Sequence, residues 1–304
     1  MSADSTLLDS LGSAELPFCK MAGGGNDFAV FDDRKGAIGS EELLARVITT
    51  RRLSVGGDGL ILLRSSRRAD IRMDYYNADG SFADFCANGT RCAARFAFLE
   101  RMAPSSMTIE TGHAIIEASV DGENVTLSIP PPAMIEESRP LQLAGGKRVD
   151  GAYLVIGVPH YVIFFEGDDL WSLDIEPMGR EIRHHRELPD GANVNFVRIA
   201  GSRRIEVRTW ERGVEGETLS CGSGVVASSI ASVLAGRVEP PVEVLTRSGI
   251  VLRTDLARAG NGSVEQIRLT GDARVVYRGK LTTETLRGFD PDWVRQPTAK
   301  PPLT

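Results

Sequence analysis

Residues 77–95, with the sequence NADGSFADFCANGTRCAAR, place Cys86 between a turn and a helix. Turn-forming residues precede the cysteine, and the run that starts at Thr90 predicts a helix extending to about Met102. The free N–H groups and the positive end of the helix dipole favour an anion at a helix start. The position therefore favours the reactive thiolate form of a cysteine, and the same N–H groups are suited to holding a carboxylate.

The same arrangement occurs again at residues 217–224, ETLSCGSG. Cys221 follows a turn and comes just before an apolar run, 225–234, that predicts a second helix. The two cysteines are 135 positions apart (221 − 86), so they fall in opposite halves of the chain. We expect the rest of the chain to be a scaffold that brings these two helix starts face to face.

Each predicted cysteine helix is followed by a strand, a glycine turn and a second strand. The first copy reads ETGHAIIEA at 110–118 and the second reads TRSGIVLRT at 246–254. The turn glycines, Gly112 and Gly249, lie 26 and 28 positions after the preceding cysteine (112 − 86 and 249 − 221). This weak internal duplication indicates two similar α/β domains, with a cleft between them as the expected place for a small-molecule site.

Hydrophobic periodicity extends this plan along the chain. The expected strands of the first half are 28–32, 59–63, 71–75, 107–111, 113–120 and 125–129, with a helix at 41–49. The expected strands of the second half are 152–156, 160–165, 193–199, 204–209, 242–245, 250–254, 265–269 and 274–277, with a helix at 178–184. Pro130-Pro131-Pro132 is the best candidate for a linker between the halves.

The composition excludes several classes of protein. With 304 residues, of which 42% are hydrophobic and 25% charged, the chain is long enough for one large or two medium domains. Its net charge of −6 argues against general affinity for nucleic acid or for an anionic membrane. No apolar run is long enough to span a bilayer, and the first residues lack the pattern of a secretory signal, so we expect a cytoplasmic protein.

Four cysteines and four histidines are present, without a CxxC pair and without the spacing of metal ligands, so we expect no disulfide framework and no metal site. For Cys19 and Cys92 the better interpretation is a small buried hydrophobic residue. For Cys86 and Cys221 the matched helix starts favour two acid/base thiols on opposite sides of one substrate carbon. Such a pair would invert a stereocentre without a cofactor.

Residues close to the cysteines are suited to completing such a site. Gly89, Gly222 and Gly224 would let a ligand approach the backbone closely, although an ordinary turn explains them as well. Arg212 could hold a carboxylate through two hydrogen bonds, and the adjacent Glu211 could hold an ammonium group or tune a thiol. A surface ion pair is the commoner explanation of a Glu-Arg dipeptide.

Five segments, in order and spanning about residues 17 to 285, resemble the diaminopimelate epimerase family. They are KMAGGGNDFAVFD (20–32), NADGSFADFCANGTRC (77–92), GVPH (157–160), NVNF (193–196) and ERGVEGETLSCGSG (211–224). The two cysteine motifs are highly specific in combination. The resemblance implies an epimerase that works by two bases without PLP and interconverts LL- and meso-diaminopimelate, in the pathway to lysine and peptidoglycan.

The resemblance also implies a fold of two pseudo-symmetric α/β (α+β) domains, each a sheet wrapped around a central helix, with the active site in the cleft between them. Because the last strands of this family cross back to the first domain, we expect an N-terminal domain of residues 17–129 plus about 274–286. The C-terminal domain is then 130–273, and residues 1–16 and 288–304 are peripheral tails. We expect an amino acid as the substrate, no nucleic-acid or membrane partner and no cofactor, and we leave a homodimer open.

The resemblance assigns roles to individual residues. Cys86 and Cys221 match the catalytic pair, and His160 and Glu211 match residues that modulate the two thiols. The positions that match substrate-binding residues are Asn26, Asn77, Ala87, Asn88, Asn193, Glu211, Arg212, Gly222 and Ser223. In this set Asn26, Asn77, Asn193 and Arg212 hold mainly the distal end of the substrate, and Ala87-Asn88 and Gly222-Ser223 supply backbone around the α-carboxylate. From composition alone the asparagines are ordinary turn residues.

The chain departs from the family pattern at two informative places. Val158 stands where the family has an asparagine that contacts the substrate, and its side chain cannot form a hydrogen bond. Losing one hydrogen bond in a desolvated site costs about 0.5–1.5 kcal/mol. There is also one residue more than usual between Glu211 and Cys221, which we assign to Glu215, and we expect the loop to bulge while the site keeps its place.

Three other functions are compatible with parts of this pattern. A racemase of another amino acid is motivated by Val158, although Arg212, Asn77 and Asn193 argue against it. A thiol redox enzyme would use the same two cysteines as a dithiol and would require turnover with a reductant. A non-enzymatic anion-binding module would use the glycine-rich helix starts, but it would not need a thiol at both.

Overall fold

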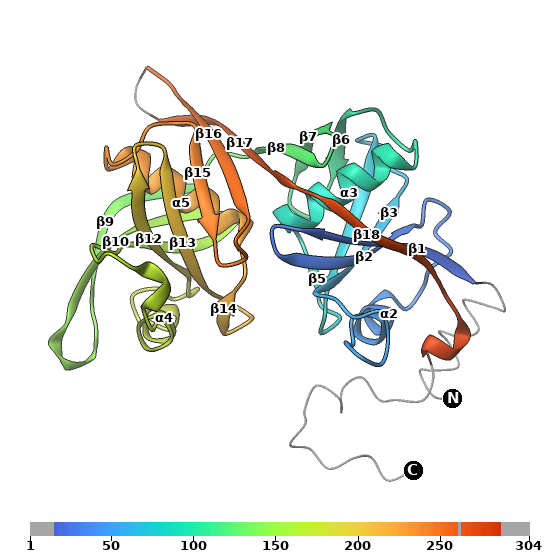
Figure 1. Ribbon diagram of the computed structural model, residues 1–304, viewed down its shortest axis with the longest axis horizontal. Coiled ribbons are helices and arrows are strands. Elements are labelled where there is room, and N and C mark those ends of the chain that lie inside the picture. Colours follow the sequence, from blue (N-terminus) through green and yellow to red (C-terminus); the bar gives the residue numbers. More distant parts are fainter. Residues whose placement is uncertain (1–14, 261–262, 287–304) are drawn as a thin grey trace, which may run out of the picture. The chain divides into compact units, whose positions relative to one another are not determined.

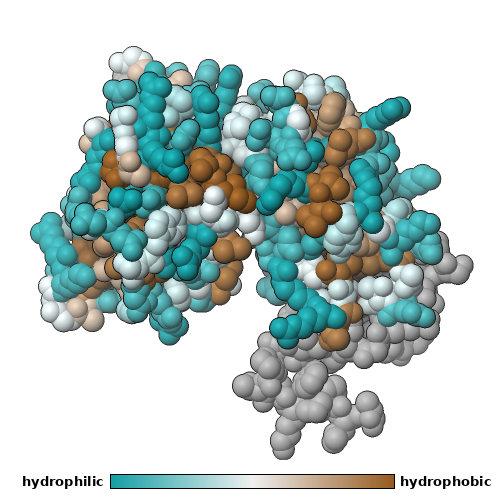
Figure 2. All heavy atoms as spheres, in the orientation of Figure 1, coloured by the Kyte–Doolittle hydropathy of each residue, from teal (hydrophilic) through white to brown (hydrophobic). Residues whose placement is uncertain are grey.

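The computed structural model describes residues 15–260 and 263–286. By its contacts the chain divides into two compact units, of which unit 2 spans Thr126–Asp272 and unit 1 comprises the described residues on either side. Each unit is a mixed sheet with helices (Figure 1). Hydrophilic side chains cover most of the visible face of each unit, with apolar patches between them (Figure 2). None of the helices in the described ranges is long and apolar enough to cross a membrane.

Unit 1 contains eight strands that lie wholly within it. They are β1 (Leu16–Gly23), β2 (Asn26–Asp32), β3 (Gly59–Arg64), β4 (Ile71–Asn77), β5 (Phe82–Ala83), β6 (Ser106–Glu110), β7 (Ile115–Asp121) and β18 (Arg274–Leu281). Antiparallel pairs join β18 to β1, β1 to β2, β3 to β4, β4 to β5 and β6 to β7. Parallel pairs join β2 to β3 and β4 to β6, because a helix makes each of these connections.

The two helices of unit 1 are buried in different ways. The amphipathic helix α2 (Glu41–Ile48) packs Leu44 and Ile48 against the sheet, and each such side chain stabilises the fold by about 1.5–3 kcal/mol. The helix α3 (Ala87–Leu99) is central: ten of its 13 residues are buried, and six strands contact it. A short 3-10 turn, η3 (Thr283–Leu286), follows β18.

Unit 2 is built from the same kinds of element. Its strands are β9 (Met134–Gln142), β10 (Arg148–Ile156), β11 (Val158–Phe164), β12 (Asn193–Gly201), β13 (Arg204–Glu211), β14 (Gly216–Thr218), β15 (Val242–Thr246), β16 (Val251–Arg258) and β17 (Val264–Asp272). Its helices and 3-10 turns are η1 (Ala144–Gly146), η2 (Leu170–Ser172), α4 (Glu176–Arg183) and α5 (Gly222–Leu234). Eleven of the 13 residues of α5 are buried, so α5 is the central helix of this unit.

The strand pairings of unit 1 recur in unit 2. β10 pairs with β11, β12 with β13, β13 with β14 and β15 with β16 in antiparallel fashion, while β11–β12 and β13–β15 are parallel. This is the order and direction found from β1 to β7, with α4 and α5 in the places of α2 and α3. β9 pairs with β10 as β18 pairs with β1. The predicted pair of similar α/β units, each with a sheet around a central helix, is confirmed.

Several boundaries differ from those expected from the sequence. β1 was not predicted, because Phe18, Cys19 and Met21 are all buried and give no alternating pattern. β9 was missed because most of it is exposed. The central helix of unit 1 ends at Leu99, before the expected Met102.

The junctions between the units lie inside or next to strands. The first falls after Val125, within β8 (Asn124–Ile129), and Pro130-Pro131-Pro132 lies beyond it, between β8 and β9. Pro130-Pro131-Pro132 is therefore part of unit 2 in this division. The second junction, at Ala273, precedes β18. The expected tails, 1–16 and 288–304, lie outside the described residues except for residues 15 and 16, and the latter begins β1.

Candidate active site

Cys86 lies at the start of the central helix of unit 1. It caps α3 with an extended backbone (φ −142°, ψ 105°), and its Sγ accepts a hydrogen bond from the Gly89 N–H at 3.4 Å. This contact is the sulfur equivalent of the cap that a Ser or Asp side chain makes. The helix start therefore directs an N–H group at the sulfur, at the end of the helix where the dipole is positive.

The first turn of α3 also carries a buried polar cluster. Asn88 donates from Nδ2 to Oδ1 of Asn26 at 2.7 Å, and Asn26 donates in turn to Oδ2 of Asp58 at 2.9 Å. Arg91 is fully buried and donates from Nη2 to Oδ1 of Asn88 at 2.8 Å. Buried polar groups need hydrogen bonds, so this cluster fixes the side chain of Asn88 and with it the first turn of the helix.

Asn77 lies apart from this cluster, at the end of β4. Its Nδ2 donates to Oγ of Ser81 at 3.0 Å, within the turn that follows the strand. The same turn is closed by Asp79, whose Oδ1 accepts from the N–H and the hydroxyl of Ser81 at 2.8 and 2.6 Å. Asn77 is therefore held by its own turn, in the manner expected of an asparagine at this kind of position.

Cys221 occupies the corresponding cap of α5 in unit 2. It is 8% exposed, its backbone is extended (φ −114°, ψ 111°), and its Sγ lies 3.5 Å from Oγ of Ser223. Gly224 packs very closely in the first turn: a Cβ added there would lie 2.4 Å from Oδ1 of Asn195 and 3.3 Å from Sγ of Cys221. Real Cβ atoms do not approach other atoms this closely, so only glycine fits at this position.

His160, on β11, belongs to a buried polar network beside this helix start. Nδ2 of Asn195 lies 3.3 Å from Nδ1 of His160, and Oγ1 of Thr209 donates to Oδ1 of Asn195 at 3.0 Å. An amide nitrogen can only donate, so Nδ1 accepts and the neutral ring carries its proton on Nε2. Burial, reinforced by the positive charge of Arg212, lowers the pKa of His160 to about 3. Nε2 has no hydrogen-bond partner in the part of the chain that the structure describes.

Glu211 ends β13, and Arg212 begins the turn that follows. Oε2 of Glu211 accepts a hydrogen bond from Oγ1 of Thr218 at 2.7 Å. The main-chain N–H of Arg212 donates to Oδ1 of the buried Asn193 at 2.7 Å, and its Nη1 donates to the carbonyl oxygen of Asp190 at 3.0 Å. A guanidinium has five N–H donors, so the single bond to a carbonyl leaves donors suited to a carboxylate.

The predicted site residues thus form separate groups, each within one unit. The start of α3 gathers Asn26, Cys86, Ala87 and Asn88. The start of α5 gathers Cys221, Gly222 and Ser223, with His160 reached through Asn195. The turn after β13 gathers Asn193, Glu211 and Arg212. Val158 begins β11, two positions before His160, and is partly buried.

Sequence reasoning missed three residues that organise these groups. Asn195 lies two positions after Asn193 on β12, and this spacing places both on one face of the strand, so the alternation was a usable signal. Arg91 lies three positions after Asn88, on the same side of α3. Asp58 follows a glycine turn, and nothing in the sequence distinguishes it from an ordinary turn residue.

Comparison with known proteins agrees with the sequence motifs. The family model "Diaminopimelate epimerase" matches residues 18–135 and 152–276. The chain is 41% identical over 267 residues to the diaminopimelate epimerase of Chlorobaculum tepidum, covering 86% of this chain and 100% of that one. It is 39% identical over 285 residues to the diaminopimelate epimerase of Aquifex aeolicus, covering 89% and 99% of the two chains.

Solved structures share the fold at low sequence identity. A Bacillus anthracis phenazine biosynthesis protein of the PhzF family has a TM-score of 0.66 to this chain at 16% identity, covering 88% of this chain and 99% of its own. A likeness at this identity concerns the fold alone. It agrees with the architecture of two similar units described above.

Proposed function

Because the chain belongs to the diaminopimelate epimerase family, we propose that it interconverts LL-2,6-diaminopimelate and meso-2,6-diaminopimelate. Family membership makes the protein an isomerase. The observation that carries the proposal is the pair of cysteines, Cys86 and Cys221, each capping the buried central helix of its unit. The product would serve lysine and peptidoglycan precursor biosynthesis.

Inversion at an α-carbon needs a base on one face and an acid on the other. We assign these roles to the two cysteines: the thiolate of one removes the α-proton, and the thiol of the other delivers its proton to the opposite face. One S–H bond forms and one breaks, so no net proton is consumed and the two sulfurs exchange ionisation states. The reverse reaction then starts from the product with the roles exchanged.

The carbanion formed between these steps requires stabilisation. Because the proposal uses no cofactor, the protein must supply it, through N–H groups directed at the α-carboxylate as this becomes enolate-like. The first-turn residues Ala87, Asn88, Gly222 and Ser223 supply such groups at two helix starts. A single donor directed at developing charge is worth about 2.7–4 kcal/mol in a water-excluded site.

We assign His160 and Glu211 to tuning the thiols. A ring whose pKa is about 3 is neutral near pH 7, so His160 can act there only as a hydrogen-bond donor or acceptor, and Nε2–H is its unused donor. Oε2 of Glu211 accepts a hydrogen bond from Thr218, which fixes the carboxylate at the end of β13. A carboxylate in a fixed position is suited to accepting a hydrogen bond from an ammonium group or a thiol.

The distal end of the substrate carries a second ammonium and a second carboxylate. We assign Arg212 to the carboxylate, supported by Asn193, which fixes its main chain. Asn26 and Asn77 complete the proposed set from unit 1. A site built for both ends rejects simple amino acids, since its polar groups would otherwise remain unpaired.

The first test is incubation of the reduced protein with LL-diaminopimelate in D₂O, followed by NMR. We expect loss of the α-proton signal together with the appearance of the meso isomer carrying deuterium. The same incubation with a panel of other amino acids tests the second candidate function, a racemase of another amino acid, which Val158 motivates. Folded, reduced protein that leaves the α-proton of LL-diaminopimelate in place would contradict the proposal.

We further propose that the protein is cytoplasmic, because the mechanism needs reduced thiols and the reducing cytosol keeps thiols in that state. We also propose a homodimer. Candidates for its interface are the exposed apolar side chains of unit 1, which include Phe98, Leu99, Val276 and Tyr277, these four being 40–56% exposed. Analytical ultracentrifugation tests the dimer, and a sedimentation coefficient of a 32.9 kDa monomer at micromolar concentration would contradict it.

A further inference from the structure

We propose that Glu215 is a positioning residue for Arg212. It fastens the turn between β13 and β14 to the end of α4, and so determines where the Arg212 guanidinium lies. The inference rests on the proposed function, because the use of Arg212 is assigned there to the distal carboxylate of the substrate.

The carboxylate of Glu215 makes contacts with both of its oxygens. Oε1 accepts hydrogen bonds from Nε of Arg183 at 3.0 Å and from the N–H of Gly213 at 3.1 Å, and Nη2 of Arg183 lies 2.9 Å away. Oε2 lies 3.0 Å from Nε2 of His184, the residue that caps α4. One side chain therefore joins its own turn to the last residues of a helix.

These contacts form a closed path that includes Arg212. Nη1 of Arg212 donates to the carbonyl oxygen of Asp190. The next residue, Gly191, lies directly against the Arg183 guanidinium: a Cβ added to Gly191 would be 1.9 Å from Nη1 of Arg183. Arg183 in turn holds Glu215. Arg212 is thus connected to Asp190 by its Nη1 and to Glu215 by the main chain of its own turn, so removing the Glu215 carboxylate breaks this path at one point.

The backbone of Glu215 adds a second argument. Its φ is 55°, in the left-handed region that non-glycine residues rarely adopt, and its N–H donates to the carbonyl oxygen of Glu211 at 2.9 Å. This conformation costs about 1 kcal/mol or more for a residue with a Cβ, so the surrounding contacts must hold it in place. Glycine would adopt it without strain but would lack the carboxylate.

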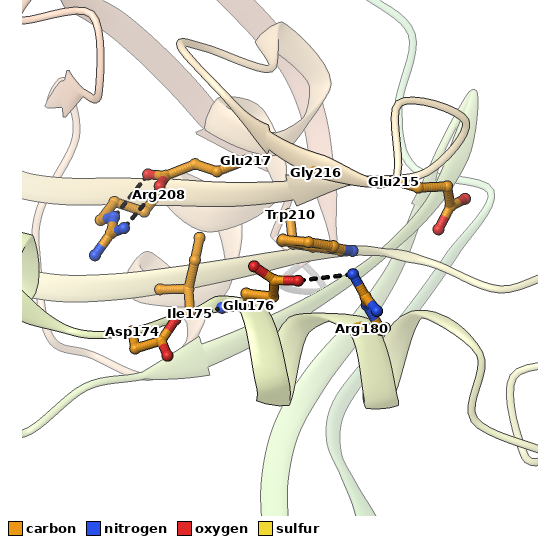
Figure 3. A pocket seen from close by; sticks show the side chains of 9 residues that line it. All are labelled: Asp174, Ile175, Glu176, Arg180, Arg208, Trp210, Glu215, Gly216 and Glu217. Atoms are coloured by element: carbon orange, nitrogen blue, oxygen red, sulfur yellow. Dashed lines mark hydrogen bonds and ion pairs between the residues drawn. The ribbon is translucent and has the colours of Figure 1, made fainter. Parts of the chain in front are cut away.

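The turn is also bordered by open space. A pocket of about 400 Å³ lies beside it, and its lining includes Trp210, Glu215 and Arg180. Figure 3 shows Glu215 at the opposite end of this pocket from the Arg208–Glu217 ion pair. Because no packed core supports the turn on this side, its position depends on the contacts of Glu215.

The corresponding turn of unit 1 is also attached to a helix end, by different means. Oγ1 of Thr49, the cap of α2, donates to the carbonyl oxygen of Ala78 at 3.3 Å, and Gly80 lies so close that an added Cβ would be 2.7 Å from the carbonyl oxygen of Glu42. A side-chain hydroxyl and a close backbone approach thus connect this turn to α2. In unit 2 the ion pair between Glu215 and Arg183 connects the turn to α4.

The test compares Glu215→Gln and Glu215→Gly with the wild-type protein. Both variants remove the carboxylate, and only the glycine also relieves the left-handed strain. A merely structural role for Glu215 predicts a change in stability with unchanged kinetics. Glu166→Gln is the matched control, since it removes an exposed ion pair, with Arg237, that lies elsewhere in unit 2.

We expect KM for LL-diaminopimelate to rise about two- to fivefold in both Glu215 variants, because the loss of an exposed ion pair is worth up to about 1 kcal/mol, or about fivefold. kcat should stay within about twofold, since Arg212 holds the substrate equally in the ground and transition states. Amide hydrogen exchange of residues 212–216 should accelerate, while the melting temperature of Glu215→Gly does not fall. The control should match the wild type in all three measurements.

Two results would overturn the inference: unchanged exchange at 212–216, or a KM change that appears only together with a fall in melting temperature. Failure of the proposed function is distinguishable from both. In that case the wild-type protein would leave the α-proton of LL-diaminopimelate in place, while the exchange measurement would still show whether Glu215 fastens the turn.

Discussion

The central helices α3 and α5 are counterparts that hold their cysteines in different surroundings. Both begin just after a cysteine with an extended backbone. The first turn of α3 is fixed by a buried cation, Arg91, whereas the start of α5 adjoins a neutral network that contains His160 and Asn195. The repeat therefore preserves the position of a thiol at a helix start and changes the groups that surround it.

The strand registers show which residues of the two units are equivalent. When the paired residues are counted strand by strand from the two cysteines, the parallel pair Phe28↔Gly59 of unit 1 is equivalent to His160↔Asn193 of unit 2. Unit 1 thus has an aromatic ring and a glycine where unit 2 has an imidazole and an amide. The two cysteines therefore have the same position at their helix starts, while the side chains on the neighbouring strands differ.

The largest effect is expected from removing either thiol, which tests whether the starts of α3 and α5 play equivalent parts in catalysis. We expect Cys86→Ala and Cys221→Ala each to lower the rate of epimerisation about 10²–10⁴-fold, because general acid–base catalysis contributes that much. The measurement is the appearance of the meso isomer from LL-diaminopimelate, with circular dichroism as the check on folding.

The same variants separate the roles of the two thiols. A protein that keeps one base should still exchange the α-proton of one stereoisomer with D₂O without inverting it, and the two variants should differ in which stereoisomer they exchange. Full turnover in either variant would contradict the two-base mechanism.

A pair of glycine substitutions compares the two helix starts directly. Gly89 and Gly224 each lie three positions after the cysteine. An added Cβ would be 3.2 Å from the flexible end of Ile61 in unit 1, but 2.4 Å from Oδ1 of Asn195 in unit 2. We therefore expect Gly224→Ala to destabilise the protein by about 1–3 kcal/mol and to lower kcat strongly.

Gly89→Ala is the matched control, and its stability should be unchanged or slightly higher because alanine favours a helix. Urea unfolding and initial rates measure both effects. Equal losses in the two variants would show that the starts of α3 and α5 are alike in their packing, contrary to the comparison.

The sequence predicted the repeated element well and its surroundings poorly. A cysteine after a turn and before a helix is a local pattern, so residues 77–95 and 217–224 were sufficient to predict both helix starts. The groups that fix each first turn come from distant strands and loops. Asp58 reaches Asn26 across 32 positions, and His160 meets Asn195 across 35, distances over which periodicity carries no information.

The neutral network of unit 2 predicts a dependence of stability on acid. The pKa of His160 is about 3 in the folded protein and about 6.5 in an unfolded chain. Between these values the unfolded state binds a proton that the folded state excludes, so stability is complete above pH 6.5 and falls as the pH decreases toward 3. We expect the wild type to lose about 2 kcal/mol more than His160→Gln between pH 7 and pH 5.

Urea unfolding at the two pH values measures this difference. Unit 1 supplies the contrast, because the buried Arg91 stays charged throughout this range. A wild-type protein whose stability falls no more steeply than that of His160→Gln would mean that the imidazole gains its proton while the protein remains folded. The neutral role proposed for this ring would then be wrong.

The smallest expected effect concerns Val158. In the comparison of the two units, the strand registers make it the equivalent of Asn26. Val158→Asn would give both units an amide at this position. The side chain of Val158 is only partly buried, so the position has room for the amide. We expect KM for LL-diaminopimelate to fall about two- to tenfold, the value of one added hydrogen bond, with kcat little changed. Such a result would make the valine a tolerated loss of affinity in a site that still binds diaminopimelate. A rise in KM for this substrate, together with a fall in the rate for another amino acid in the panel, would instead identify Val158 as an apolar contact to a different side chain, and the specificity of unit 2 would have to be reassigned.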